Sequence, residues 1–298
     1  TPGHVDFTME VERSLRVLDG MVAVFCAVAG VQPQSETVWR QADRYRVPRI
    51  AFINKCDKLG ADPHAVVAAM RERLGAEPLL LQLPYGLGDQ FIGVLDLLRM
   101  RARRWTDATG ATFVDERIPV ALYDDAAAAR DALYERIAEL DEVAMSAFVA
   151  GKLDAAGAEA ALRRITIAGR GVPTLCGAAS RNKGVHNLLD AVVAYLPSPE
   201  DVPAVAGAEP KTGVAMVRAA DRQAPLAALA FKVHTDAVGQ LTFVRVYAGA
   251  LSVGDSVLNA KRDRLEEVGK LYRVHANHKE EVKTLEAGMI GAIGASGR

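Results

Sequence analysis

Four consecutive residues, Asn54-Lys55-Cys56-Asp57, follow a short apolar run and carry side chains suited to binding a ligand. A guanine base presents two adjacent N–H donors on one edge, and the carboxylate of Asp57 offers two acceptors at a matching separation. Adenine lacks this donor pair and would leave the carboxylate unpaired. Asn54 would bond the base and tie neighbouring loops together, while the stem of Lys55 would cover the base plane. A plain strand-end turn is the alternative, because Asn and Asp favour turns.

A second candidate motif, Thr1-Pro2-Gly3-His4, opens the sequence. A glycine such as Gly3 lets the backbone approach a phosphate closely, so that its N–H donates to the terminal oxygen. His4, just beyond it, is placed to orient a water for in-line attack on that phosphate. The alternative is a turn before a helix, since Pro and Gly are turn residues.

The elements expected around these motifs alternate between strands and helices. Three apolar runs, at residues 21–30, 49–54 and more weakly 173–179, have the pattern of strands buried on both faces. Helices are predicted at residues 35–46, 63–74 and 190–196. This alternation predicts a doubly wound parallel α/β sheet, in which ligands bind beyond the carboxyl ends of the strands. The two motifs then stand in the order that a GTPase needs, with the phosphate sensor ahead of the first strand and the base reader after the second.

The spacing between the second and third strands is abnormal. About 120 positions separate Asp57 from Gly177, whereas a βαβ unit needs about 30. The excess contains further apolar runs, a turn at Thr109 and Gly110, and Ala-rich amphipathic material at residues 123–140. Because structureless loops of that length are rare, we expect an inserted α/β subdomain at about residues 78–170.

The remainder of the chain changes character after the first domain, which we place at residues 1–200. Residues 201–225 are rich in Pro, Ala and charge and are predicted to be a linker that carries at most a stray strand. Residues 226–298 alternate apolar and polar positions between Gly turns, which predicts an antiparallel β-barrel domain.

Composition sets broad limits on function. The 298 residues carry 36 Lys and Arg against 37 Asp and Glu, so the net charge of −1 gives no sign of nucleic acid binding. No apolar run approaches the roughly 20 residues that span a bilayer, and no signal peptide pattern is visible. Cys26, Cys56 and Cys176 lie far apart and have no metal-ligand spacing. We therefore expect a cytoplasmic protein with reduced thiols and no metal site among its own residues.

Longer stretches of the sequence resemble one family. The segments TPGHVDFTMEVERSLRVLDG and GVQPQSETVWRQADRYRVPRIAFINKCD are similar to elongation factor G at nearly every position. The segments LGAEPLLLQLPYG and FIGVLDLLRMRA resemble the inserted G′ subdomain of that family, and KLYRVHANHKEEVKTLEAGMIGAIG resembles its second, barrel domain. The resemblance covers essentially all 298 residues.

The resemblance implies a P-loop-type GTPase that couples GTP hydrolysis on the ribosome to movement of tRNA and mRNA, and to ribosome recycling. GTP or GDP and Mg²⁺ would be the cofactors, the ribosome with its tRNA and mRNA the partners, and the protein a monomer away from membranes. His4 would place the attacking water and Gly3 would contact the γ-phosphate. The backbone N–H of Ala179 would meet guanine O6, beside the base-reading side chains already described.

The sequence also departs from the family. Ala178 stands where the family has Ser, and Ser180 where an aromatic residue is common, so we expect somewhat weaker nucleotide binding. No GxxxxGK[ST] motif occurs. The resemblance therefore implies an internal piece without the phosphate-binding loop, the first switch and the C-terminal domains, and most Mg²⁺ ligands would lie outside it. Such a piece should bind and hydrolyse GTP poorly.

Two alternatives remain open at this point. Another ribosomal GTPase with the same insert, of the release-factor or ribosomal-protection type, would share most of these features. A ribosome-binding paralogue without enzymatic activity would fit the relaxed motif at Ala178, although it has no physical reason to keep both His4 and the guanine reader.

Overall fold

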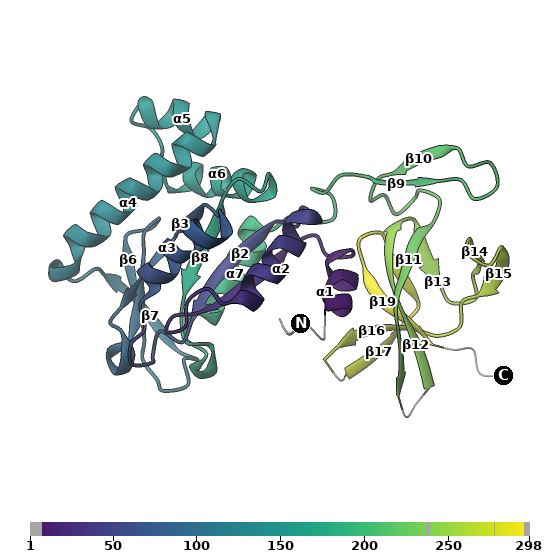
Figure 1. The fold of residues 1–298 in the computed structure, drawn as a ribbon, viewed down its shortest axis with the longest axis horizontal. Helices are drawn as coiled ribbons and strands as arrows, with labels where there is room; N and C mark the ends of the chain where they lie inside the picture. Colours follow the sequence, from purple (N-terminus) through teal and green to yellow (C-terminus); the bar gives the residue numbers. More distant parts are fainter. Residues whose placement is uncertain (1–7, 237–238, 277, 295–298) are drawn as a thin grey trace. The chain divides into compact units, whose positions relative to one another are not determined.

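The structure is a computed structural model, and it describes residues 8–236, 239–276 and 278–294 (Figure 1). Gly3 and His4 lie outside the described residues. The chain divides into two compact units, Thr1–Pro197 and Ser198–Arg298. Each unit is built around a sheet of its own.

A parallel sheet forms the centre of the first unit. In the described part of the chain it has four strands in the order β1 (Met21–Cys26), β2 (Arg49–Asn54), β8 (Val172–Cys176) and β3 (Pro78–Leu80). Neighbouring strands run parallel in register, with Ala51 opposite Thr174. The predicted parallel α/β sheet is confirmed.

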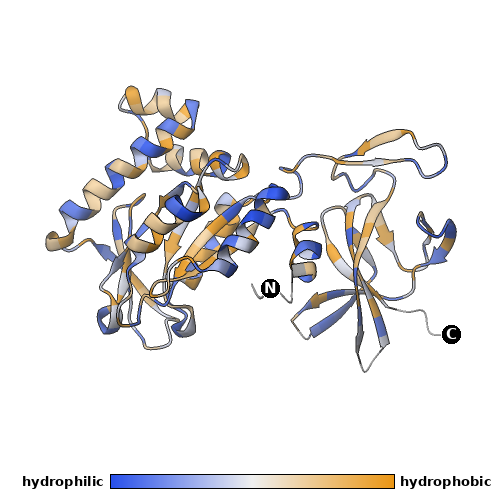
Figure 2. Cartoon of the chain, in the orientation of Figure 1, coloured by the Kyte–Doolittle hydropathy of each residue, from blue (hydrophilic) through white to orange (hydrophobic). Residues whose placement is uncertain are grey.

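Strand β2 lies inside this sheet and sends alternate side chains into two hydrophobic clusters. Ile50 and Phe52 join the cluster that includes helix α7 (Val185–Tyr195), and Ile53 joins the cluster that includes α2 (Pro33–Arg44) and α3 (Pro63–Leu74). Helices therefore cover both faces of the sheet, as the doubly wound pattern requires. Figure 2 shows the strands of this sheet largely in the hydrophobic colour and α2 largely in the hydrophilic one.

Helix α3 shows why its bounds were readable from the sequence. The side chain of Asp62 accepts a hydrogen bond from the Ala65 N–H at 3.0 Å and so caps the first turn, with Pro63 at the first helical position. Gly75 ends the helix in the left-handed region at φ 59°. The predicted helix at residues 63–74 is found with these bounds, whereas α2 begins two residues earlier than predicted.

Strand β1 differs from its prediction. The strand ends at Cys26, not at Gly30, and it is not buried on both faces, since Val24 is 57% exposed while Phe25 is 2% exposed. It lies at the edge of the described sheet with β2 as its one neighbour there. An apolar run indicates a strand but does not tell an edge position from a central one.

Beyond β3, the long spacing between α3 and β8 holds a second sheet, a short 3-10 helix (Gly88–Gln90) and three α-helices in the described chain. The antiparallel sheet follows the order β4 (Gln82–Tyr85), β5 (Gly93–Asp96), β6 (Arg101–Trp105) and β7 (Phe113–Arg117). The helices of this insert are α4 (Val120–Leu140), α5 (Glu142–Val149) and α6 (Ala155–Ile167). Side chains from these elements share a hydrophobic cluster with β2 and α7, so the insert belongs to the same compact unit as the parallel sheet.

The second unit is rich in β structure. Its largest described sheet has five strands, and Val244, Val246 and Leu271 lie in its core. The strands of that sheet, in order, are β11 (Ala227–Asp236), β12 (Gly239–Ala248), β19 (Ile290–Gly294), β16 (Leu271–His275) and β17 (His278–Val282). Shorter antiparallel pairs are β13 (Ala250–Ser252) with β18 (Thr284–Glu286) and β14 (Ser256–Asn259) with β15 (Arg264–Glu267).

Two strands also form within the segment that composition suggested was a linker. β9 (Val205–Ala208) and β10 (Ala215–Arg218) pair as an antiparallel ladder. The Pro- and charge-rich composition therefore concealed a hairpin.

Among the described residues, no helix is both long and apolar enough to cross a membrane.

Candidate functional site

The candidate site lies where two neighbouring parallel strands end. Ile53 in β2 is paired with Cys176 in β8, so the loops that follow these strands emerge at the same edge of the sheet. Backbone hydrogen bonds join the loops directly. The Gly177 N–H donates to the Ile53 carbonyl at 2.9 Å, and the Cys56 N–H donates to the Gly177 carbonyl at 3.0 Å. Residues 54–57 and 177–183 therefore form one connected surface.

The side chain of Asn54 links the two loops. Its Oδ1 accepts the N–H of Lys55 at 2.8 Å and the N–H of Ala179, 125 positions away in the chain, at 2.9 Å. The Ala179 N–H, for which the resemblance to elongation factor G implied a contact with guanine O6, is thus already engaged by a protein acceptor. A base oxygen at this position would share that donor with Asn54 or displace it.

Asp57 is a buried carboxylate at the end of β2. Its side chain is 1% exposed, and neither of its oxygens accepts a hydrogen bond from the described residues. Arg181 Nε lies 3.2 Å from Oδ2 as an ion pair without hydrogen-bond geometry, and Lys58 Nζ lies 3.9 Å away. A buried carboxylate that lacks hydrogen-bond donors is costly unless a ligand supplies them. Its two oxygens are the acceptors that a guanine edge requires.

Lys55 adopts a left-handed backbone conformation with φ 69°. A long side chain rarely occupies this region, and such residues cluster at functional sites. The side chain is exposed and makes no hydrogen bond or ion pair with the described part of the chain. Its stem is therefore available to a ligand beside Asn54 and Asp57.

Ala178 begins the second loop and is completely buried. The Ala178 N–H donates to the Lys183 carbonyl at 2.9 Å, and the Lys183 N–H donates back to the Ala178 carbonyl at 3.1 Å. These bonds close a short turn over Ala179–Arg181, in which Asn182 has φ 55°. No side chain caps the start of this turn, because Ala178 has no hydroxyl group.

Comparison with known proteins decides the family. Residues 1–198 match the elongation factor Tu GTP binding domain, and residues 239–296 match elongation factor Tu domain 2. This chain belongs to the elongation factor Tu family of translational GTPases. The crystal structure of the protein ttk003000868 from Thermus thermophilus is similar to this GTPase, with a TM-score of 0.81 at 26% identity. The match covers 99% of this chain and 41% of that one, so this chain spans less than half of that protein's length.

The family assignment indicates what the two loops at residues 54–57 and 177–183 could bind. A GTP-binding domain implies guanine nucleotide binding, and residues 54–57 carry a buried carboxylate, Asp57, that accepts no hydrogen bond from the described residues. Arg181 was missed by the sequence reasoning. The signal that would have found it is its position two residues after Ala179, within the same short turn.

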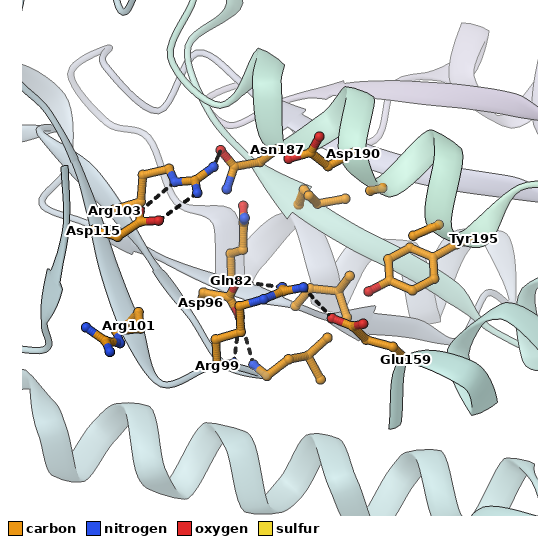
Figure 3. Close-up of a pocket in the computed structure, with 15 residues that line it drawn as sticks. Gln82, Asp96, Arg99, Arg101, Arg103, Asp115, Glu159, Asn187, Asp190 and Tyr195 are labelled. Atoms are coloured by element: carbon orange, nitrogen blue, oxygen red, sulfur yellow. Dashed lines mark hydrogen bonds and ion pairs between the residues drawn. The ribbon is translucent and has the colours of Figure 1, made fainter. Parts of the chain in front are cut away.

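A separate cavity of about 340 Å³ lies between the insert sheet and α7 (Figure 3). Arg99 bridges Asp96 at 3.2 Å and Glu159 of α6 at 2.6 Å, and Arg103 holds Asp115 through two bonds of 2.7 and 2.8 Å. Arg103 also reaches Asn187 of α7 at 3.4 Å. The polar lining of this cavity therefore joins the sheet of the insert to α6, which is also part of the insert, and to α7, and it includes none of residues 54–57.

Proposed function

We propose that this translational GTPase is of the elongation factor G type and couples GTP hydrolysis on the ribosome to movement of tRNA and mRNA, and to ribosome recycling. The observation that carries the nucleotide part is the buried Asp57 carboxylate, whose two oxygens lack hydrogen-bond donors at the carboxyl edge of the sheet. The stretch GVQPQSETVWRQA and the barrel segment that contains HAN support the elongation factor G type.

Base recognition follows from the geometry of residues 54–57. The N1–H and 2-amino group of guanine would donate to the two oxygens of Asp57 as a charge-assisted pair. The stem of Lys55 would lie along the base plane, and the Ala179 N–H would approach O6. Asn54 would hold the two loops at the spacing that these contacts need. Adenine would leave the buried carboxylate without donors, which selects against it by a factor on the order of 10⁴.

The phosphate chemistry rests on residues outside the described part of the chain. We propose that the Gly3 N–H contacts the γ-phosphate and that His4 orients the attacking water, from the order of the motifs and the resemblance to elongation factor G. Among the described residues, no group of three or more His, Cys, Asp or Glu side chains is arranged to hold a metal ion. The described residues therefore offer no ready-made set of ligands for Mg²⁺.

We place the nucleotide-binding domain at residues 1–200, with the inserted G′ subdomain at about residues 78–170, and domain II at residues 226–298. The protein would act in the cytoplasm as a monomer, with the ribosome as its direct partner and tRNA and mRNA as indirect ones. A release-factor or ribosomal-protection GTPase is the alternative. An assay of mRNA movement on ribosomes with the complete protein separates these, since only the elongation factor G type should advance mRNA.

The substitution Asp57→Asn tests the proposed contact between the Asp57 carboxylate and the guanine base. The new amide offers one acceptor and one donor, so it should lose the guanine pair and accept xanthine, which keeps N1–H but has a carbonyl in place of the 2-amino group. We expect a loss of about 100-fold in GDP affinity, with xanthosine diphosphate then preferred to GDP. Titrations of the complete protein with GDP and with xanthosine diphosphate measure both affinities.

Asp124→Asn is the matched control, because Asp124 is exposed on α4 and makes no hydrogen bond or ion pair within the described chain. GDP affinity that is unchanged in Asp57→Asn, or a wild type that does not prefer GDP to ADP, would overturn the proposed base reader. In the second case the binding paralogue without enzymatic activity becomes the better account, as the absence of a Ser at Ala178 already favours it mildly.

A further inference from the structure

The turn between β6 and β7 of the insert lies against the loop that carries Ala179. Gly110, at the tip of this turn, has φ 66°. A Cβ built on Gly110 would lie 2.3 Å from the carbonyl oxygen of Arg181, 2.9 Å from the carbonyl carbon of Asn182 and 3.0 Å from the N of Lys183. All three atoms are backbone, so no side chain can move aside to make room. Backbone therefore packs directly on backbone here, and no residue except glycine fits.

The turn that presents Gly110 is held by its own hydrogen bonds. The Asp107 carboxylate accepts the backbone N–H groups of Thr109 at 2.7 Å, Ala111 at 3.2 Å and Thr112 at 2.6 Å. It also accepts the hydroxyl groups of Thr109 and Thr112. These donors, led by the Thr109 and Thr112 hydroxyls, hold the pKa of Asp107 well below its usual range. These hydrogen bonds hold residues 107–112 in one backbone conformation and so fix the position of Gly110 within the turn.

The insert also contacts the two base-reading loops elsewhere. The Lys183 ammonium donates to the Phe91 carbonyl at 3.0 Å, which ties the end of the second loop to the insert. The Gly88 N–H donates to the Cys56 carbonyl at 2.9 Å, which ties the insert to residues 54–57. Residues of the insert therefore contact both loops of the candidate base site.

We propose that the insert turn at residues 106–112 is a positioning element for the guanine-reading loop, and that Gly110 is its positioning residue. The inference rests on the proposed nucleotide site. Residues 178–183 have no side-chain cap and are held by the Ala178 backbone bonds and by the bond from the Ala179 N–H to Asn54, and the turn that carries Gly110 adds backbone packing against Arg181, Asn182 and Lys183. Displacement of the turn should therefore lower guanine affinity through the position of residues 178–183.

Gly110→Ala in the full chain tests this, with Gly151→Ala and Gly169→Ala as matched controls. Gly151 and Gly169 have φ 65° and 68°, so a new methyl group meets the same backbone strain, but nothing lies within 4 Å of their added Cβ. The first readout is hydrogen exchange of the Ala179 and Lys183 amides in protein without nucleotide. We expect exchange about tenfold faster at both amides in Gly110→Ala only, with Leu175 in β8 unchanged.

The second readout is GDP affinity, which should fall about tenfold in Gly110→Ala relative to the two controls because a preorganised loop is lost. Exchange at Ala179 and Lys183 equal to that of Gly151→Ala would overturn the proposal. A wild type without preference for GDP over ADP would sink the proposed nucleotide site instead, while the exchange rates would still decide whether residues 106–112 hold the loop.

Gly110→Ala could unfold the β6–β7 hairpin, and faster hydrogen exchange at the Arg104 and Val114 amides would reveal that unfolding. In that case Lys183→Met is the second variant. This variant keeps an unbranched stem, adds no bulk at Gly110 and removes the bond to the Phe91 carbonyl. Hydrogen exchange at the Ala179 amide that is faster in Lys183→Met than in wild type, by less than in Gly110→Ala, supports the bracing role of the insert. Unchanged exchange at Ala179 in Lys183→Met overturns it.

Discussion

The Nε of Arg181 lies 3.2 Å from Oδ2 of Asp57, and the two side chains differ sharply in exposure, at 48% and 1%. The half-exposed guanidinium thus serves as a counter-ion for the buried carboxylate. Because it does not make a hydrogen bond with Asp57, both carboxylate oxygens keep their capacity for a ligand. If the proposed base site is correct, a guanine edge would reach these oxygens once the Arg181 side chain moves aside.

Arg181→Ala should raise GDP affinity and lower the stability of the protein without nucleotide. An ion pair with one half-exposed partner contributes about 0.2–1 kcal/mol, so release of this competitor should tighten GDP binding by up to about fivefold. Titration with GDP at fixed ionic strength measures the affinity, and urea unfolding measures the stability. Arg181→Lys keeps the charge and is the control. Weaker GDP binding in Arg181→Ala would show that the guanidinium contacts the base instead of guarding the site.

Asn54→Ala should separate the two base-reading loops. It removes the acceptor of the Lys55 and Ala179 N–H groups, and we expect a loss of about 1–3 kcal/mol in the free energy of unfolding. Hydrogen exchange at Ala179 should become faster at the same time. Asn187→Ala removes one longer bond, at 3.4 Å to Arg103, and should cost less. Equal losses in the two variants would contradict a linking role for Asn54.

Much of the parallel sheet was predictable because its signals are local. Pro63 and Gly75 mark the ends of α3 within the sequence itself, and the apolar run at Arg49–Asn54 identifies the strand that places Asn54 at the carboxyl edge. The position of Asp57 just beyond the end of this strand follows from the same run, and its role in binding a base stays a prediction. These features depend on residues a few positions apart, where propensity and periodicity are informative.

The contacts across the site could not be predicted in this way. Arg181 contacts Asp57, and Gly110 lies against the Arg181 backbone, through tertiary packing of segments far apart in the sequence. No pattern in the sequence connects these positions. The exposure of Val24 has a related cause, since its place at a sheet edge depends on the order of strands and not on its apolar neighbours.

Ala178→Ser should strengthen nucleotide binding. Residue 178 stands at the start of the short turn Ala179–Arg181, where a hydroxyl group can accept a backbone N–H of that turn. Such a cap contributes about 0.5–2 kcal/mol and would hold the Ala179 N–H in place. GDP titration in a complete protein measures the effect. Ala161→Ser places a hydroxyl at an equally buried position in α6 and should leave affinity unchanged. GDP affinity that does not change in Ala178→Ser would refute the prediction.

Asp141→Asn should reveal a pH-dependent contribution to stability from the insert. Arg164 donates to the Asp141 carboxylate at 2.9 and 2.7 Å, and this bonding, together with the Ala144 N–H, lowers the pKa of Asp141 from its ordinary value of 3.8. Because the pKa is lower in the folded protein, the contribution is fully present above pH 3.8 and is lost as the pH falls towards the folded value.

At pH 7 we expect Asp141→Asn to lose about 1–2 kcal/mol in the free energy of unfolding, since the first turn of α5 loses its charged cap and Arg164 loses its partner. Urea unfolding at pH 7 and in the acid range below pH 3.8 measures how the difference from wild type changes. The difference should shrink on acidification, whereas Asp124→Asn, at an exposed position of α4, should show little difference at either pH. A gap between wild type and Asp141→Asn that stays constant, or widens, on acidification would mean that the carboxylate charge is not what stabilises this part of the insert.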